Sequence, residues 1–229
     1  DPRYLENNIF KFFDQWLETG GPLFTYVHFR APHFPIVPPP PFLDMYKNKK
    51  SGPKKDRLIF RLKKLAEEGH RFTPDEIQDI IDDYDSAIRY VDSQVGELID
   101  TLKAKNLYRS SFIIFTSDHG EALYEHGYWG HGQTVYDEAG RVPLIVKFPA
   151  QMNLKANRRI KTVVQLADIF PTFATLLGEK RYFDGRSLLE AINIEKEDDT
   201  FAFSTSFGTP PTIGMRWRSW YYIVYLHDN

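Results

Sequence analysis

The sequence predicts an α/β fold, with a mixed, largely parallel sheet flanked by helices and a small antiparallel sheet at the C-terminal end. Short apolar runs typical of buried strands alternate with amphipathic stretches of helical period. The 229 residues are 42% hydrophobic, which is enough to bury a substantial core. From residue 201 onward, short apolar runs follow one another closely, as in antiparallel hairpins.

The N-terminal elements are a helix, a strand and a loop. Residues 4–18 carry apolar side chains at helical spacing, and the glycines and proline at 20–22 end that pattern. Leu23–Phe29 is short, apolar and aromatic, which predicts a buried strand with His28 as a hydrogen-bonded core residue. The prolines that follow, up to 38–41, predict an extended loop because proline cannot continue a ladder.

A basic segment and a long helix come next. Lys47–Lys64 is rich in Lys and Arg, which favours a solvated insertion, with a patch that recruits an anionic substrate as the alternative. Thr73 is a suitable N-cap, Pro74 suits the first helical position and Glu76 completes a capping box. An apolar stripe of helical period then predicts one amphipathic helix to about residue 104.

Residues 112–116 and 144–148 predict two further buried strands, and residues 166–177 predict a helix that ends at Gly178. Three short strands close the chain, at 201–206, 212–217 and 220–226. We expect residues 1–195 to form part of an α/β catalytic domain, and residues 196–229 to begin a small β subdomain.

The composition excludes some functions. The formal net charge is −2, which argues against nucleic acid as a partner because no positive field exists to hold phosphates. No apolar run approaches the roughly 20 residues of a membrane span. There is no cysteine, so this portion forms no disulfide. The chain starts Asp1-Pro2-Arg3, and we expect a piece of a longer protein with its targeting signal upstream.

The strongest candidate for chemistry is the pair Asp118 and His119, directly after the predicted strand 112–116. A carboxylate and an imidazole at the end of a strand can bind one divalent cation, and Gly120 lets the chain turn away. The alternative is a pair that caps a helix or forms a surface hydrogen bond.

Histidines supply two more polar clusters. His126 and His131 lie among three glycines, where the backbone can approach a ligand closely, and His33 lies on the proline-rich loop. The ends of strands converge on one crevice in an open α/β sheet. A metal with imidazole donors suits transfer of a sulfuryl or phosphoryl group, because charge on the nonbridging oxygens must be offset while the leaving oxygen is protonated.

Nearly the whole chain resembles the sulfatases of the alkaline-phosphatase superfamily. The resemblance rests on the order and spacing of PLFTYVHFRAPHFPIVPP, YDSAIRYVDSQVGELIDTLKAKNLYRSSFIIFTSDHGE, GHGQTVYDEAGRVPLIVKFP, VQLADIFPTFATLLG, DGRSLLEAI and GMRWRSWYYIVY. It implies an alkaline-phosphatase-like fold and hydrolysis of a sulfuric ester.

The resemblance implies roles for individual residues. Asp118 and His119 match metal ligands, for which Ca2+ is the expected ion. His33 matches the histidine that contacts the ester or its leaving oxygen. His131 stands where many sulfatases have a sulfate-binding lysine, so it is expected to be catalytic and substrate-binding together with His33. We expect His126 to be structural, with Glu138 bracing the loop before the next strand.

The family's nucleophile is a formylglycine made from Cys or Ser in a Cys/Ser-x-Pro/Ala-x-Arg motif. The chain has no cysteine, and Ser51-Gly52-Pro53 lacks the Arg, so we expect the nucleophile to lie upstream. We therefore expect the 229-residue chain alone to be inactive and to bind metal weakly.

Two alternatives remain open. One is a phospho-group enzyme of the same superfamily, a phosphonate monoester hydrolase or a phosphoethanolamine transferase, with Mn2+ or Zn2+ as the metal. The other is a non-catalytic binding module that keeps the fold. The resemblance further implies a sulfated small molecule or carbohydrate as substrate, and a secreted, periplasmic or lysosomal location.

Overall fold

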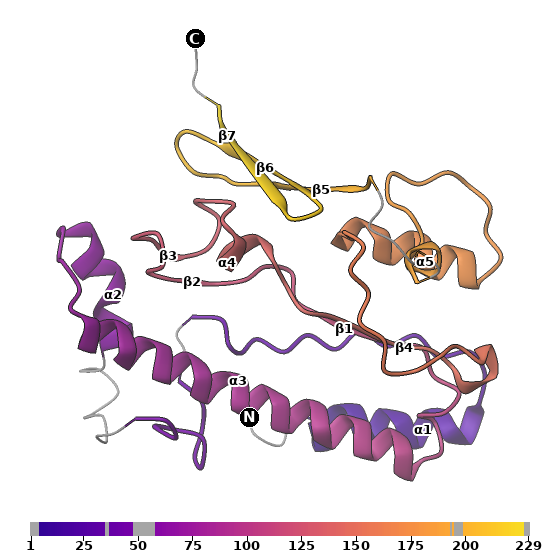
Figure 1. Ribbon diagram of the computed structural model, residues 1–229. Helices are drawn as coiled ribbons and strands as arrows, with labels where there is room; N and C mark the ends of the chain where they lie inside the picture. The colour runs from indigo at the N-terminus through magenta and orange to yellow at the C-terminus, as the bar shows by residue number, and fades with distance from the viewer. Residues whose placement is uncertain (1–4, 35–36, 48–57, 193, 195–198, 227–229) are drawn as a thin grey trace. The chain divides into compact units, whose positions relative to one another are not determined.

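The computed structural model describes residues 5–34, 37–47, 58–192, 194 and 199–226 (Figure 1). The chain divides into two compact units, Asp1–Ser111 and Phe112–Asn229. Ser51-Gly52-Pro53 and most of the basic segment before residue 58 lie outside the described residues.

The first unit begins with a π-helical turn, Leu5–Phe10, that continues into helix α1, Lys11–Thr19. This confirms the predicted N-terminal helix. Phe13 is its buried residue, and the helix ends where Gly20 adopts a φ of 69°, a conformation that glycine reaches without steric cost.

The predicted strand at Leu23–Phe29 is wrong, because these residues form no ladder. The pattern of burial alternates only in part: Leu23 and Val27 are half-buried and Phe24 and Tyr26 are 75% and 76% exposed, but Thr25 between them is exposed too. A strand is defined by a hydrogen-bonded neighbour, and the described part of the first unit contains no strand with which this segment pairs. The segment therefore has the composition of a strand without belonging to a sheet.

Helix α3, Pro74–Ala104, confirms the predicted long helix and its start. The hydroxyl of Thr73 accepts a hydrogen bond from the backbone N–H of Glu76, and the carboxylate of Glu76 accepts one from the N–H of Thr73 over 2.9 Å. The capping box thus satisfies two amides that the first helical turn leaves without a partner.

The solvated insertion predicted for Lys47–Lys64 is partly wrong. Residues from 58 onward belong to helix α2, Leu58–Glu67, which contacts α3 and buries Ile59 completely. The Lys47 side chain is only 2% exposed, and its ammonium lies 2.9 Å from a carboxylate oxygen of Asp79 and of Asp83. These aspartates of α3 compensate the charge of Lys47, which is why it lies inside the unit.

The second unit is built on strands β1, Ile113–Thr116, and β4, Leu144–Lys147. Both strands were predicted, but they pair antiparallel, with Thr116 opposite Leu144. A parallel neighbour needs a long crossover, usually a covering helix. The connection from β1 to β4 instead holds the short hairpin strands β2, Ala122–Leu123, and β3, Trp129–Gly130, and the one-turn helix α4, Asp137–Gly140.

All strand pairs in the described residues are antiparallel, so the predicted largely parallel sheet is not found among them. The connections between β2 and β3, β5 and β6, and β6 and β7 are short and reverse the chain direction, and the longer connection from β1 to β4 contains no long helix that could form a parallel crossover.

The predicted helix at 166–177 is present as a 3₁₀ turn, Leu166–Asp168, and helix α5, Ile169–Leu176. Gly178 follows with a φ of 81°, as expected for a residue after a helix end. A further 3₁₀ turn, Ala150–Met152, and a short helix α6, Leu188–Ala191, complete this region.

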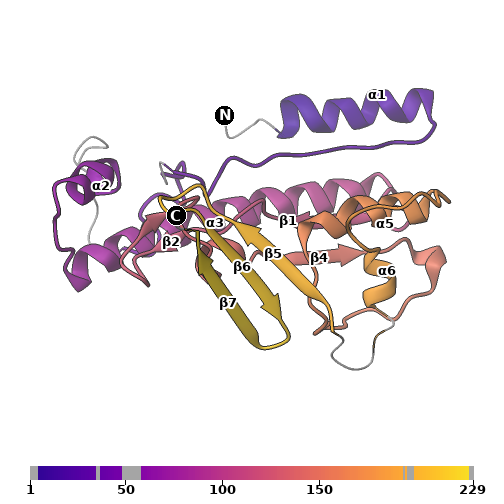
Figure 2. The ribbon, with the colours of Figure 1, turned by 90° about the horizontal axis from the view of Figure 1, so that it is seen from above.

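The C-terminal antiparallel sheet is confirmed as β5, Phe201–Thr205, β6, Thr212–Trp217, and β7, Trp220–Tyr225, which lie side by side in Figure 2. The sheet is tied to residues 132–140: the hydroxyl of Tyr221 on β7 donates to the carbonyl of Val135, and the N–H of Phe207, between β5 and β6, donates to the carbonyl of Gly132 over 2.7 Å. The predicted domain boundary between residues 195 and 196 stays a prediction.

No helix in the described ranges is both long and apolar enough to cross a membrane.

Candidate functional site

The site in the second unit begins where β1 ends. The hydroxyl of Thr116 donates to the carbonyl of Pro143 over 2.9 Å, and the hydroxyl of Ser117 donates to the carbonyl of His119 over 2.7 Å. The backbone N–H of His119 donates to Oδ1 of Asp118 over 3.1 Å. The bonds made by Ser117 and His119 are local and hold the carboxylate and the imidazole in one tight turn, whereas the bond from Thr116 to Pro143 joins this turn to the residue before β4.

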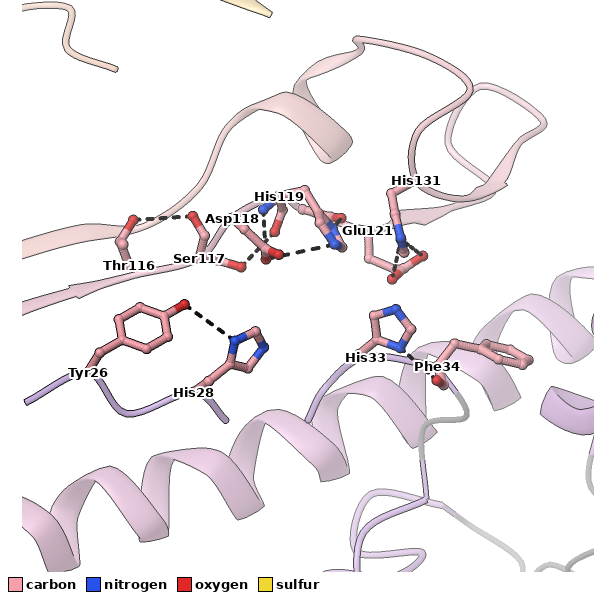
Figure 3. A network of polar contacts seen from close by, with 11 residues as sticks. Tyr26, His28, His33, Phe34, Thr116, Ser117, Asp118, His119, Glu121 and His131 are labelled. Atoms are coloured by element: carbon pink, nitrogen blue, oxygen red, sulfur yellow. Dashed lines mark hydrogen bonds and ion pairs between the residues drawn. The ribbon is translucent and has the colours of Figure 1, made fainter. Parts of the chain in front are cut away.

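One hydrogen bond determines the tautomer of His119. Its Nδ1 lies 2.7 Å from the carbonyl oxygen of Gly120, which can only accept, so Nδ1 carries the proton. The neutral ring then has its lone pair on Nε2, and this atom lies 3.8 Å from Oδ1 of Asp118 (Figure 3). A backbone carbonyl that orients a histidine in this way is typical of metal-binding imidazoles.

Asp118 and His119 fit a divalent cation as part of its ligand set. Oxygen and nitrogen donors bind such ions at about 2.0–2.6 Å, and the 3.8 Å between Oδ1 and Nε2 allows both to reach one ion. Asp118 is 73% exposed, so an ion can reach it. Within the described residues no three side chains of His, Cys, Asp or Glu come together as a metal set, so this pair accounts for two ligands only.

The β2–β3 hairpin brings His131 to this turn. The rings of His119 and His131 stack with centroids 3.7 Å apart and planes 23° apart. Nδ1 of His131 lies 3.3 Å and 3.4 Å from the two carboxylate oxygens of Glu121. The structure therefore brings together three residues predicted from sequence, Asp118, His119 and His131.

Sequence reasoning missed Glu121 as the partner of His131. The contact follows from the register of the hairpin, which pairs Ala122 with Gly130 and thereby sets residue 121 opposite residue 131. Strands of two residues are too short to recognise from periodicity, so the register could not be predicted.

His126 forms a second pair with Glu138, which belongs to α4. Nδ1 of His126 lies 2.6 Å from Oε1 of Glu138, and the ring stacks on Tyr136 at 3.9 Å. The hydroxyls of Tyr136 and Tyr225 lie 3.1 Å apart, and this hydrogen bond, followed by burial, raises the pKa of Tyr136 above its usual 10.0. The contacts support the bracing role expected for Glu138, because they tie the histidine loop to α4 and β7.

His33 belongs to the first unit. It lies in an exposed turn, where its N–H donates to the carbonyl of Arg30 over 2.9 Å and its Nδ1 lies 2.7 Å from the carbonyl of Phe34. His28 is exposed and lies 3.3 Å from the hydroxyl of Tyr26, so the core role predicted for it is wrong. Without a sheet around residues 23–29, no core covers its ring.

The fold and the paired donors define a class: an α/β protein with a carboxylate and an imidazole side by side at the end of a strand. The family model described as Sulfatase matches residues 2–179, and the chain belongs to the sulfatase family. Among solved structures, yidJ from Bacteroides fragilis is 22% identical with a TM-score of 0.77, over 99% of this chain and 49% of that one. Such structures imply the alkaline-phosphatase-like α/β fold.

Arylsulfatase K from Rattus norvegicus is 30% identical over 168 residues, which cover 68% of this chain and 29% of that protein. Choline-sulfatase from Rhizobium meliloti is 30% identical over 152 residues, covering 63% and 29% respectively. Phosphonate monoester hydrolase from Silicibacter pomeroyi has a TM-score of 0.77 at 23% identity, over 98% of this chain and 51% of that one. The chain thus spans less than a third of the two sequence relatives and about half of the two solved chains.

Proposed function

We propose that this chain forms part of a sulfuric ester hydrolase and carries two of its metal ligands. The observation that supports this best is the turn Asp118–Gly120, in which the carbonyl of Gly120 selects the His119 tautomer with its lone pair on Nε2, 3.8 Å from Asp118. A tautomer held in this way suits metal binding, and the chain belongs to a family of ester hydrolases.

Asp118 and His119 would hold the divalent cation, for which we propose Ca2+. When bound, such an ion offsets the negative charge on the nonbridging oxygens of the ester. His131 stacks on His119, and we propose that it donates a hydrogen bond to an ester oxygen or protonates the leaving group. We propose that His33 also contacts the ester or its leaving oxygen.

The nucleophile and the remaining ligands are proposed to lie in a part of the protein outside this chain. The chain has no cysteine for conversion to formylglycine, and no group of three or more possible metal donors comes together among its described residues. On this proposal the 229-residue chain alone does not turn over a sulfate ester.

We propose a sulfated carbohydrate as the substrate class. A structural neighbour, BT4656, is in complex with its substrate D-glucosamine-2-N,6-O-disulfate, with a TM-score of 0.54 at 22% identity. Sulfated small molecules are the other candidates, since one sequence relative is a choline-sulfatase. A secreted, periplasmic or lysosomal location would fit such substrates.

A phospho-group hydrolase is the second candidate. It is favoured by the likeness to phosphonate monoester hydrolase, and by an oxygen-plus-nitrogen donor pair that also suits Mn2+ or Zn2+. The metal preference and the nucleophile distinguish the two candidates.

The test uses the full-length protein. Peptide mass mapping should find a formylglycine upstream of Asp1, and the protein should hydrolyse a p-nitrophenyl sulfate in the presence of Ca2+. Asp118→Asn should lower bound metal, measured by elemental analysis, and abolish turnover. Asp100→Asn is the matched control, because Asp100 is 76% exposed on α3 and pairs only with Lys103 in the described contacts.

Each result has one interpretation. An unmodified Thr or Ser nucleophile, with turnover of a phosphonate ester instead, would transfer the assignment to the phospho-group class. Metal binding that is absent from the wild type, or unchanged by Asp118→Asn, would contradict the proposed site and favour a binding module.

A further inference from the structure

Two imidazole rings lie stacked at the centre of the site, and each has its Nδ1 held by an acceptor. In His119 the acceptor is the carbonyl of Gly120, and in His131 it is the carboxylate of Glu121. The carbonyl of Gly120 belongs to the turn that holds the two proposed metal ligands. Glu121 has no role in the function proposed above, and its side chain is almost buried, at 8% exposed.

The β2–β3 hairpin builds the pair of Glu121 and His131. Ala122 pairs with Gly130, so the next positions outward, 121 and 131, stand opposite each other across the strands. Directly opposite side chains of an antiparallel pair lie close enough to interact. The contact is therefore set by the register of the hairpin.

The position of Gly130, directly before His131, favours glycine because of its backbone conformation. It has a φ of 84°, which other residues rarely adopt, whereas a Cβ placed there would only come into ordinary contact with Oε1 of Glu121, at 3.4 Å. The carboxylate of Glu121 thus lies against the backbone that leads into His131.

We propose that Glu121 is a positioning residue, which holds the ring orientation of His131 and its Nδ1–H tautomer. An ionised carboxylate only accepts, so Nδ1 must donate to it. The Nε2 atom of His131 is then the atom that would face the ester. A ring with its proton on Nδ1 alone only accepts at Nε2, so the donation required by the proposed function, on which this inference rests, comes from the doubly protonated ring, whose Nδ1–H stays on Glu121. Carboxylates that orient metal-bound histidines contribute about 10–100-fold to affinity or activity, and we expect an effect of the same size here.

The first test measures the tautomer and needs no activity. Long-range proton–nitrogen correlation spectra of the full-length protein, labelled with ¹⁵N-histidine and recorded where the rings are neutral, should show His131 protonated at Nδ1. The His131→Asn variant assigns the signal. In Glu121→Gln the population should shift toward Nε2–H, because an amide can donate to Nδ1 as well as accept from it.

Glu125→Gln is the matched control, since it removes the same charge from the turn of the same hairpin. Oε2 of Glu125 accepts from the N–H of Leu123 over 2.6 Å and makes no described contact with His131. Its spectrum for His131 should equal that of the wild type. A wild-type His131 protonated at Nε2, or a signal unchanged in Glu121→Gln, would overturn the inference.

The second test uses turnover of p-nitrophenyl sulfate and a double-mutant cycle. Glu121→Gln should lower kcat/KM by about 10–100-fold. The double variant Glu121→Gln/His131→Asn should be no slower than His131→Asn alone, because Glu121 is argued to act through His131. Additive losses would show that Glu121 acts elsewhere. If no sulfate ester is hydrolysed, the proposed function fails while the tautomer measurement still decides the inference.

Discussion

The backbone N–H of Gly120 donates a hydrogen bond of 2.8 Å to the carbonyl of Ala139. This contact fastens the turn that carries Asp118 and His119 to helix α4. It is close enough that a Cβ at Gly120 would lie only 2.0 Å from the carbonyl oxygen of Glu138. The position of the two proposed metal ligands is therefore coupled to the packing of α4.

Gly120→Ala should destabilise the protein by about 1–3 kcal/mol, because the methyl group meets backbone that cannot rotate away. The measurement is the urea midpoint of unfolding. Gly96→Ala is the control: Gly96 lies within α3, no neighbouring atom lies within 4 Å of where the alanine methyl would be, and alanine there should stabilise by about 0.5–1 kcal/mol. A neutral Gly120→Ala would show that the turn and α4 are not in close contact.

Thr73→Ala should cost about 1 kcal/mol, because it removes the hydroxyl that accepts from the N–H of Glu76 at the start of α3. Chemical denaturation monitored by helical circular dichroism measures the loss. Thr73→Ser keeps the hydroxyl and should stay close to the wild type. An equal loss in both variants would assign the effect to the methyl group rather than to the cap.

The stability contributed by Glu76 should depend on pH. The hydrogen bond from the N–H of Thr73, followed by one from His70, lowers the pKa of the Glu76 carboxyl below its usual 4.5. A carboxyl with a lowered pKa stabilises the fold above its unfolded pKa, and this contribution is lost as the pH falls through the folded pKa. The difference in urea midpoint between wild type and Glu76→Gln should therefore be present at pH 7 and shrink on acidification through pH 4. A difference independent of pH would contradict this.

Lys47→Met should destabilise the first unit strongly, by about 3–5 kcal/mol, because it leaves the carboxylate of Asp83 buried without its cation. The side chains of Lys47 and Asp83 are 2% and 0% exposed. Lys64→Met is the control, since Lys64 is 79% exposed in its 3.7 Å pair with Glu68 and should change stability by less than about 1 kcal/mol. Similar effects from both substitutions would show that the Lys47 pair is solvated in solution.

Local elements were predictable from the sequence because their determinants lie within a few residues. The start of α3 depends on Thr73, Pro74 and Glu76, which are close together in sequence, and the structure has the predicted capping box. The three C-terminal strands were likewise indicated by short apolar runs with turns between them. These predictions are confirmed because no distant contact had to be known.

Predictions that needed a distant partner were less successful. Leu23–Phe29 has the composition of a strand, yet a ladder requires a neighbouring strand that its own residues do not specify. Lys47 was interpreted as solvated because its sequence neighbours are basic, whereas its partners Asp79 and Asp83 lie on α3. The composition of a segment gives its average charge. It does not indicate which of its charged side chains will pair with residues of a distant helix.

The sequence by itself determined that Asp118 and His119 stand together after an apolar strand, that glycines flank His126 and His131, and where the long helix begins. Only the tertiary structure decided that β4 runs antiparallel to β1, that His131 stacks on His119, and that Glu121 holds the imidazole of His131. The physical reason is that spacing along the chain encodes hydrogen bonds made within a turn. Contacts across strands depend instead on register and packing, which the whole chain sets together.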